Sequence, residues 1–387
     1  MTGEFVLVTG ASGYIGSHVV FALLEAGINV LAMENSTSTE SGSLKKLQET
    51  SDKKLQICRC NLLNNEEISS IFKQFPISTV IHLAASKGVS QSMSSPLACY
   101  SNNLLSTINL ITAMKQYKVF NMIFSSSCAV YGDQSQLPVN ETAQSHSPTN
   151  VYAKSKKFVE EMLSDIAKAD KEFKFIIFRY FNPVGAHESN LIGEDPSKLQ
   201  VSLLTLMCNV ALGRKEKITI FGNCIRDYIH VMDIAEAHTV ALKKFQDNFN
   251  FKVINLGSSR GTSLLELIQI FENVNNVKIP YEIKEKREGE IEAIVADTNL
   301  AENELGWKAR RNIESMCRDS DFASQEIHYE TNINESDENI DSNLNYNDFQ
   351  NQQNNIGPLD NFNNGEYEIP KHFSYHKIID QRITYND

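Results

Sequence analysis

A tyrosine and a lysine four positions apart are the residues of this sequence best suited to acid–base chemistry. The stretch "NVYAKSK" places Tyr152 and Lys156 one helical turn apart, so both side chains leave the same face of a helix. A free tyrosine, with a pKa of about 10, is a poor base at neutral pH. A neighbouring ammonium group favours the phenolate and gives a base matched to a hydroxyl substrate. The same spacing also occurs by chance on many helices, so its meaning depends on the surrounding sequence.

A serine cluster precedes this pair. The stretch "FSSSCAVYGD" places Ser125, Ser126, Ser127 and Cys128 at the end of an apolar run. Polar side chains at the carboxyl end of a parallel strand lie at the edge where such sheets bind ligands. A polar strand end with no chemical role has the same composition, so the residues alone do not single out one of the four.

A glycine-rich turn lies near the N-terminus. The stretch "VTGASGYIGSH" spaces Gly10, Gly13 and Gly16 by three residues, between an expected strand and an expected helix. Such glycines permit a tight turn and let backbone N–H groups approach a pyrophosphate. The next expected strand ends in Glu34 and Asn35, where a carboxylate accepts hydrogen bonds from ribose and repels a 2′-phosphate. The sequence therefore favours NAD over NADP, although Glu34 could also be a solvated acid at a strand end.

The elements that carry these residues alternate between strand and helix. This rhythm predicts a Rossmann-type, doubly wound parallel sheet covered by helices on both faces, with a smaller mixed α/β domain after it. The expected strands are 5–10, 28–33, 54–58, 79–85, 121–127 and 174–181, and the expected helices are 14–26, 66–75, 97–117 and 152–169. Residues 1–182 form the cofactor domain, and the chain returns to it around 225–260. Residues 183–224 and 261–329 form the smaller domain.

The C-terminal residues 330–387 differ in composition from the rest. They are rich in Asn, Asp and Gln with scattered apolar residues, which predicts a largely disordered acidic extension. From position 319 onwards the chain holds 14 of its 48 acidic and 3 of its 36 basic residues, so most of the net charge of −12 lies there. The remainder is nearly neutral, which argues against a nucleic-acid surface.

The apolar segments, the N-terminus and the cysteines limit the class of function. No apolar stretch is long enough to cross a membrane, and no signal-peptide pattern is present, so we expect a cytoplasmic protein. The seven cysteines are scattered. Cys58 and Cys60 share one face of an expected strand, which favours packing over metal binding, and we expect no metal site.

Eight stretches together resemble a known family. They are "TGASGYIGSH", "VIHLAA", "FSSSCAVYGD", "YAKSK", "RYFNPVGAH", "GED", "RDYIHVMDIAEAH" and "LGW". They resemble the extended short-chain dehydrogenase/reductase superfamily and, within it, the UDP-glucose 4-epimerase family, over roughly residues 4–329. The resemblance implies an NAD-dependent isomerase of galactose metabolism that interconverts UDP-glucose and UDP-galactose through a transient 4-keto sugar. It also implies a homodimer built on the helices 97–117 and 152–169, and a smaller domain that binds the nucleotide sugar.

The resemblance assigns roles to individual positions. Tyr152 is expected to remove the proton of the sugar 4-hydroxyl, Ser127 to hydrogen-bond the 4-oxygen, and Lys156 to hold the nicotinamide ribose and lower the pKa of Tyr152. The implied cofactor contacts are Gly10, Gly13, Tyr14, Ile15, Gly16, Glu34, Asn35, Asn61, Leu62, Leu83, Ala84, Ala85, Lys87, Asn102, Lys156 and Phe181. The implied substrate contacts are Lys87, Ser127, Tyr152, Asn182, Ser202, Phe221, Arg226, Arg287 and Glu290.

Some positions depart from the family pattern. Asn61 stands where an aspartate normally contacts adenine, and the loop before Arg226 is shortened. Ser202 replaces an asparagine, and glutamate replaces aspartate at Glu34 and Glu290. These changes leave two alternatives open: an enzyme for another nucleotide sugar, such as a UDP-N-acetylhexosamine, and a weakly active or inactive NAD-binding paralogue with a regulatory role. Cys128 and Ala129 replace the acid pair of related dehydratases, which disfavours water elimination.

Overall fold

The computed structural model describes residues 3–35, 42–51, 54–143, 148–189, 191–195, 201–286 and 290–320. All described residues belong to one compact unit. The expected disordered extension, 330–387, lies outside the described residues.

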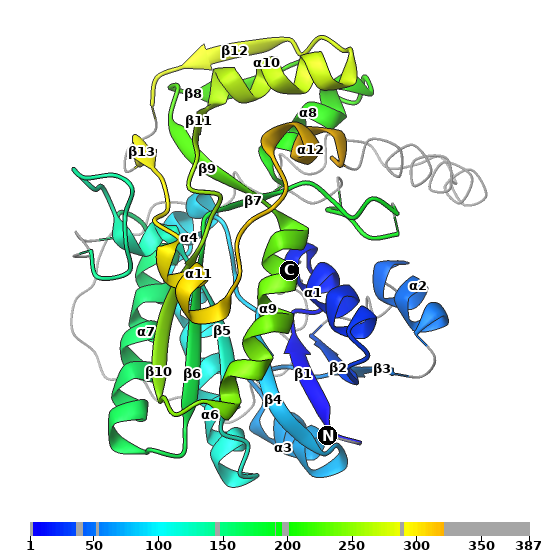
Figure 1. The fold of residues 1–387 in the computed structure, drawn as a ribbon, viewed down its shortest axis with the longest axis vertical. Helices are drawn as coiled ribbons and strands as arrows, with labels where there is room; N and C mark the ends of the chain where they lie inside the picture. The colour runs from blue at the N-terminus through cyan, green and yellow to red at the C-terminus, as the bar shows by residue number, and fades with distance from the viewer. Residues whose placement is uncertain are drawn as a thin grey trace, which may run out of the picture. The chain divides into compact units, whose positions relative to one another are not determined.

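A parallel sheet of seven strands forms the larger part of the described unit (Figure 1). Its order is β10-β6-β5-β4-β1-β2-β3, and every neighbouring pair is parallel. The bounds are β1 Phe5–Thr9, β2 Val30–Glu34, β3 Leu55–Arg59, β4 Ile77–His82, β5 Asn121–Ser127, β6 Lys174–Tyr180 and β10 Phe251–Leu256. The direction of the strand order reverses between β1 and β4, which is the doubly wound arrangement expected from the sequence. The predicted fold class is confirmed.

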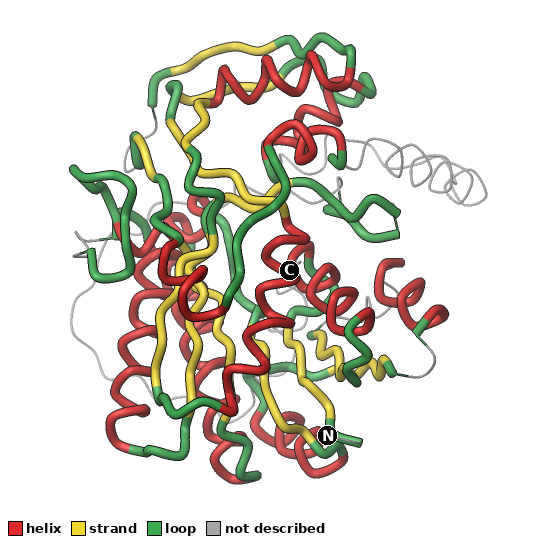
Figure 2. The backbone as a smooth tube through the Cα atoms, viewed as in Figure 1, coloured by secondary structure: helices red, strands yellow, loops and turns green. Residues whose placement is uncertain are grey.

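Helices cover both faces of this sheet, as the ribbon and the tube show (Figures 1 and 2). One hydrophobic core combines alternate strand residues such as Val6 and Val8 with residues of α1 (Tyr14–Glu25), α2 (Gly42–Thr50) and α9 (Val231–Leu242). The other core takes the intervening strand residues, such as Leu7, with α3 (Asn65–Gln74), α6 (Ser106–Gln116) and α7 (Val151–Ala169). A strand points successive side chains to opposite faces, so the buried sheet needs two apolar layers.

The helix expected over 97–117 is a composite. It consists of α5 (Pro96–Tyr100), a π-helical turn (Ser101–Leu105) and α6, and α4 (Val89–Ser94) precedes it. A π turn accommodates one extra residue, so it rotates the following side chains relative to a regular helix. Helical periodicity alone does not reveal such a turn, and the sequence reading also missed α2 and α4.

The smaller part combines two short sheets with three helices. One sheet joins β7 (Asn182–Val184), β9 (Ile225–His230), β11 (Gly261–Ser263) and β13 (Ala293–Ile294), and the other pairs β8 (Ile218–Phe221) with β12 (Tyr281–Lys284). The helices are α8 (Leu203–Ala211), α10 (Leu264–Asn275) and α12 (Ile313–Arg318). Within the stretch 225–260, β10 is the strand that joins the large sheet, whereas β9 belongs to the smaller one. The remaining elements are two 3-10 turns (Cys128–Tyr131 and Lys243–Gln246) and α11 (Asn299–Leu305).

None of the helices in the described ranges is long and apolar enough to cross a membrane. The described residues also contain no group of three or more His, Cys, Asp or Glu side chains placed to hold a metal ion.

Candidate functional site

The glycine-rich turn between β1 and α1 has the close contacts that require glycine. Gly10 has φ +66°, and a Cβ added there would lie 2.9 Å from Ala84 Cα. A Cβ on Gly16 would lie 2.0 Å from the carbonyl oxygen of Gly10. Gly13 is the N-cap of α1 and offers no side chain to the first turn. The turn therefore brings bare backbone N–H groups to the carboxyl edge of the sheet, which is the arrangement that binds a pyrophosphate.

Glu34 is buried at the end of β2, with 2% of its surface exposed. Its Oε1 accepts a hydrogen bond from the backbone N–H of Ser12, inside the glycine-rich turn. Glu34 is therefore not a solvated acid at a strand end. The carboxylate belongs to the turn and lies where the sequence reading expected the ribose contact.

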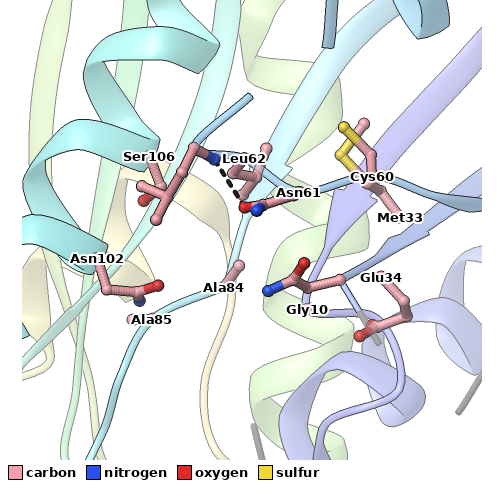
Figure 3. Close-up of a pocket in the computed structure, with 12 residues that line it drawn as sticks. Gly10, Met33, Glu34, Cys60, Asn61, Leu62, Ala84, Ala85, Asn102 and Ser106 are labelled. Atoms are coloured by element: carbon pink, nitrogen blue, oxygen red, sulfur yellow. Dashed lines mark hydrogen bonds between the residues drawn. The ribbon is translucent and has the colours of Figure 1, made fainter. Parts of the chain in front are cut away.

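A pocket opens beside Glu34 at the same edge of the sheet (Figure 3). Eight of the predicted cofactor residues line it: Gly10, Glu34, Asn35, Asn61, Leu62, Ala84, Ala85 and Asn102. Met33, Cys60, Leu63 and Ser106 complete the lining. The Asn61 Oδ1 accepts the Leu63 backbone N–H at 2.9 Å, so the side chain that replaces aspartate forms a local turn. Tyr14 and Ile15 lie in the first turn of α1, and Leu83 follows β4, where its N–H donates to Thr9 Oγ1 at 3.2 Å.

Three predicted catalytic residues meet at the end of β5 and the start of α7. Ser127 is the last residue of β5, and Tyr152 and Lys156 share the first two turns of α7. The Lys156 Nζ donates to the carbonyl oxygen of Ser125 at 2.7 Å and lies 5.9 Å from the centroid of the Tyr152 ring. The arrangement brings a phenol, a hydroxyl and an amine together at this edge of the sheet, with Lys156 buried and Ser127 and Tyr152 half-buried.

Burial shifts the pKa of both titratable groups in this constellation. It raises the pKa of Tyr152 to about 12, while a hydrogen bond with the Ser127 side chain acts in the opposite direction. It lowers the pKa of Lys156 to about 7. The Tyr152 shift is opposite to the depression expected from the sequence. The physical reason is that removal of water disfavours every charged form, which a sequence pattern does not report.

Two polar networks that the sequence reading missed support the catalytic residues. Ser126 Oγ donates to Glu160 at 2.5 Å, and Glu160 is paired with Arg179 through bonds of 3.0 and 2.7 Å, all buried. Asn103 Nδ2 donates to Ser155 Oγ at 2.9 Å and to the Ser86 carbonyl at 3.1 Å. The first network fixes the end of β5 against α7.

The Asn103 network links the loop after β4 to the helix that carries Lys156. Asn103 lies within the π-helical turn, next to the predicted Asn102. Ser125 and Ser126, which the pattern could not distinguish from plain strand-end serines, contact Lys156 and Glu160 respectively. Their position directly before Ser127 was the one available signal.

The predicted substrate residues form two clusters. Arg226 in β9 pairs with Glu290 at 3.5 Å. Lys87 lies 3.9 Å from Glu194, which also accepts the Ser202 N–H at 2.7 Å. Glu194, in the "GED" stretch, is a buried acid that the predicted site lacked.

The other substrate positions are more scattered. Phe221 ends β8, and Phe181 is buried in a cluster with Cys128. Asn182 begins β7, and its buried Oδ1 has no hydrogen-bond partner among the described residues. Arg287 lies outside the described residues. An unsatisfied buried amide oxygen is costly, so a ligand group that donates to it would be bound more tightly.

Comparison with known proteins places this site in a family. The profile of the "NAD dependent epimerase/dehydratase family" matches residues 6–257, which include the glycine-rich turn, Ser127, Tyr152 and Lys156. The chain belongs to this family. It is 40% identical to the UDP-glucose 4-epimerase of Homo sapiens over 330 residues, covering 82% of this chain and 95% of the relative. It is 41% identical to UDP-glucose 4-epimerase 2 of Arabidopsis thaliana over 326 residues, covering 81% and 93%.

Solved structures agree with this assignment. The UDP-glucose 4-epimerase of Bifidobacterium longum, crystallised with NAD+ and UDP, superposes with a TM-score of 0.79 at 36% identity. That alignment covers 83% of this chain and 98% of the other. The predicted resemblance to the UDP-glucose 4-epimerases is confirmed.

Proposed function

We infer that this chain is an NAD-dependent isomerase that interconverts UDP-glucose and UDP-galactose. The observation that carries the inference is the constellation of Ser127, Tyr152 and Lys156 beside a dinucleotide turn, in a chain about 40% identical to UDP-glucose 4-epimerases. Reversible oxidation at the sugar C4 needs a base that removes the proton of the 4-hydroxyl, next to a group that accepts the hydride. The described residues supply the base and a binding site for the hydride acceptor.

The residues present fit NAD. Gly10 and Gly16 let the turn pack closely against Ala84 and against itself, which forms the tight glycine-rich turn that binds a diphosphate in dinucleotide folds. The Glu34 carboxylate matches a cofactor with free ribose hydroxyls and repels a 2′-phosphate. When bound, NAD would supply a nicotinamide ring that accepts a hydride from the sugar C4 and gives it back to the opposite face of the sugar.

The protein residues handle the proton. Tyr152 would remove the proton of the sugar 4-hydroxyl and return it, while Ser127 hydrogen-bonds the same oxygen. Lys156 would bind the nicotinamide ribose and contribute positive charge toward the Tyr152 phenolate. Cys128, directly after Ser127, is buried with its pKa raised to about 12, so it stays a neutral thiol and does not serve as an acid of the kind a dehydratase uses.

The smaller part would bind the nucleotide diphosphate. Arg226 is held beside Glu290, and a guanidinium group binds phosphate in a bidentate manner. Arg287, Phe221, Ser202, Lys87 and Asn182 are proposed contacts of the nucleotide sugar, and the unsatisfied Asn182 Oδ1 supports this role. On this view the large sheet binds the cofactor and the smaller sheets bind the substrate.

A homodimer would assemble on the face formed by α4 to α7. Half of the large apolar side chains that are most exposed among the described residues lie there: Val89, Met93, Leu97, Leu105, Ile108 and Phe158. Leu97 is 84% exposed. A concentration of exposed large apolar side chains on a few neighbouring helices is typical of a protein interface.

Turnover of UDP-galactose tests the proposed function directly. The purified full chain, supplied with UDP-galactose and NAD+, should produce UDP-glucose, detected with an excess of UDP-glucose dehydrogenase. Parallel reactions with UDP-N-acetylgalactosamine identify an enzyme for N-acetylated sugars. Bound NAD with no turnover of any UDP-hexose would favour the regulatory paralogue.

A further inference from the structure

Ser106 is a buried hydroxyl that no described residue satisfies. It is the first residue of α6, and 3% of its surface is exposed. Its Oγ makes no hydrogen bond with any residue that the structure describes. Ser106 lines the pocket beside Asn61, Leu62 and Asn102. It is not among the residues that the sequence assigned to the cofactor.

The helix gives this hydroxyl no partner of its own. A serine within a helix commonly bonds back to the carbonyl oxygen four residues earlier. Here the carbonyl oxygen of Asn102, at the π-helical turn, accepts the backbone N–H of Ser106, and the Ser106 Oγ makes no second bond to it. A buried hydroxyl without a partner costs free energy, so a group that enters the pocket and pairs with it is bound more tightly.

The geometry of the pocket indicates which part of the cofactor reaches Ser106. The glycine-rich turn takes the pyrophosphate, and Glu34 takes the adenosine ribose. Figure 3 shows Ser106 and Asn102 on the wall opposite Gly10 and Glu34, with Leu62 and Asn61 between them. The part of the adenosine beyond the ribose, the base, therefore faces Ser106.

The replacement of aspartate by Asn61 makes this contact more important. The Asn61 Oδ1 is already engaged by the Leu63 N–H at 2.9 Å. An amide has no negative charge, so it is a weaker acceptor for the exocyclic amine of adenine than a carboxylate. A serine hydroxyl both donates and accepts, so it can pair with the amine or with a ring nitrogen.

We propose that the Ser106 hydroxyl hydrogen-bonds the edge of the adenine base of the bound cofactor. Ser106 is thus an adenine-binding residue of this chain. The inference rests on the proposed use of NAD, and it adds a contact made by a side chain to those of the glycine-rich turn and Glu34.

The variant Ser106→Ala tests the inference through binding rather than turnover. Titration calorimetry on the full chain, stripped of cofactor, measures the dissociation constants of NAD+ and ADP-ribose. We expect Ser106→Ala to weaken both ligands by the same factor, roughly five- to twentyfold, or about 1 to 2 kcal/mol at 1.4 kcal/mol per factor of ten. Both ligands carry adenine, whereas only NAD+ carries nicotinamide.

A melting curve without ligand separates binding from structure. Alanine removes an unpaired hydroxyl and favours the helix, so the melting temperature of the ligand-free variant should not fall. Thr112→Ala, which removes an exposed hydroxyl from the same helix, should leave both constants unchanged. Unchanged constants in Ser106→Ala, a loss confined to NAD+, or a lower melting temperature without ligand would each overturn the inference. Failure of the unaltered chain to bind NAD+ would instead reject the proposed function.

Discussion

At the scale of single residues, the site joins two groups, Tyr152 and Lys156, whose charged forms are both disfavoured. Burial raises the pKa of Tyr152 to about 12 and lowers the pKa of Lys156 to about 7. Protein atoms replace water around both side chains, so the Tyr152 phenolate and the Lys156 ammonium group each lose hydration energy. A phenolate and an ammonium held in the same site stabilise one another, which relieves both penalties together.

Replacement of Tyr152 by phenylalanine should remove the proton acceptor and retain the packing. We expect kcat for UDP-galactose to fall by roughly 10²- to 10⁴-fold, the range of general acid–base catalysis. The dissociation constant of NAD+ should change by less than about threefold, because the phenol contributes to chemistry rather than to the pyrophosphate contacts. The coupled assay and calorimetry measure the two quantities. A variant that keeps more than a tenth of the activity would contradict the assigned role.

The buried pair Glu160–Arg179 should be important for stability. Glu160→Gln leaves the Arg179 guanidinium buried without its counter-charge and weakens the bond to Ser126. We expect the free energy of unfolding to fall by about 3 to 5 kcal/mol, measured by urea denaturation. The matched control is Asp165→Asn, which breaks an exposed pair with Lys168 and should cost about 0.5 kcal/mol or less. Equal losses in the two variants would show that burial does not matter here.

At the scale of elements, α7 is the part that positions the chemistry. Its N-cap is Asn150, whose side chain accepts the Ala153 N–H at 2.9 Å. The backbone N–H of Tyr152 donates to Ser92 in α4 at 3.2 Å. The first turn of α7 is therefore fixed from two sides, and Tyr152 belongs to that turn.

Loss of this cap should affect activity as well as stability. Asn150→Ala should cost about 1 kcal/mol of unfolding free energy, the usual effect of an N-cap, and should lower kcat because the first turn frays. Asn312→Ala removes the equivalent cap of α12, where Asn312 accepts the Ser315 N–H at 2.8 Å. It should cost a similar amount of stability and leave kcat unchanged. A loss of kcat of the same size in both variants would mean that Asn150 acts only through global stability.

The sequence predicted most elements of the large sheet because each strand is a short apolar run between turn residues. It placed the glycine-rich turn, Glu34, Tyr152 and Lys156 correctly on their elements. It did not predict the π-helical turn, because one added residue does not change the helical spacing of apolar residues enough to be seen over so short a stretch. It also missed Glu160, Asn103 and Glu194. The partners of Glu160 and Asn103 lie 17 to 52 residues away in the sequence, so only the fold brings them into contact.

At the scale of the whole molecule, three buried histidines should make stability depend on pH. Burial lowers the pKa of His18 and of His82 to about 3, and that of His238 to about 4. Below pH 6.5 the unfolded chain binds protons at these residues and the folded chain does not. The free energy of unfolding therefore falls as the pH falls, by about 1.4 kcal/mol per pH unit for each histidine.

Two carboxyl groups act in the opposite direction, because burial raises the pKa of both Glu141 and Asp227. The pKa of Asp227 rises to about 6, so between pH 6 and 5 the folded chain binds a proton there that the unfolded chain does not. The three histidines and Asp227 together should contribute a net loss of about 3 kcal/mol per pH unit, measured by urea denaturation at pH 6 and pH 5. His82→Gln should reduce this slope by about 1.4 kcal/mol per unit. A slope that His82→Gln leaves unchanged would place the acid sensitivity elsewhere.

The apolar face of α4 to α7 makes a second prediction for the whole molecule. Leu97→Asp combined with Phe158→Asp should convert the expected homodimer into a monomer, because both side chains are exposed on that face. Ile283→Asp, on an exposed position of β12, is the matched control and should leave the mass unchanged. Sedimentation equilibrium measures the three masses. A monomeric unaltered chain would remove the basis for the interface.

The hydrogen bond from Ser12 to Glu34 has a consequence for how the cofactor preference of this chain can evolve. The carboxylate that disfavours a 2′-phosphate also ties the glycine-rich turn to the second strand. Mutation to a basic residue would relax the preference and remove the acceptor of the Ser12 N–H in one step. Cofactor preference and the geometry of the turn are therefore coupled through one side chain.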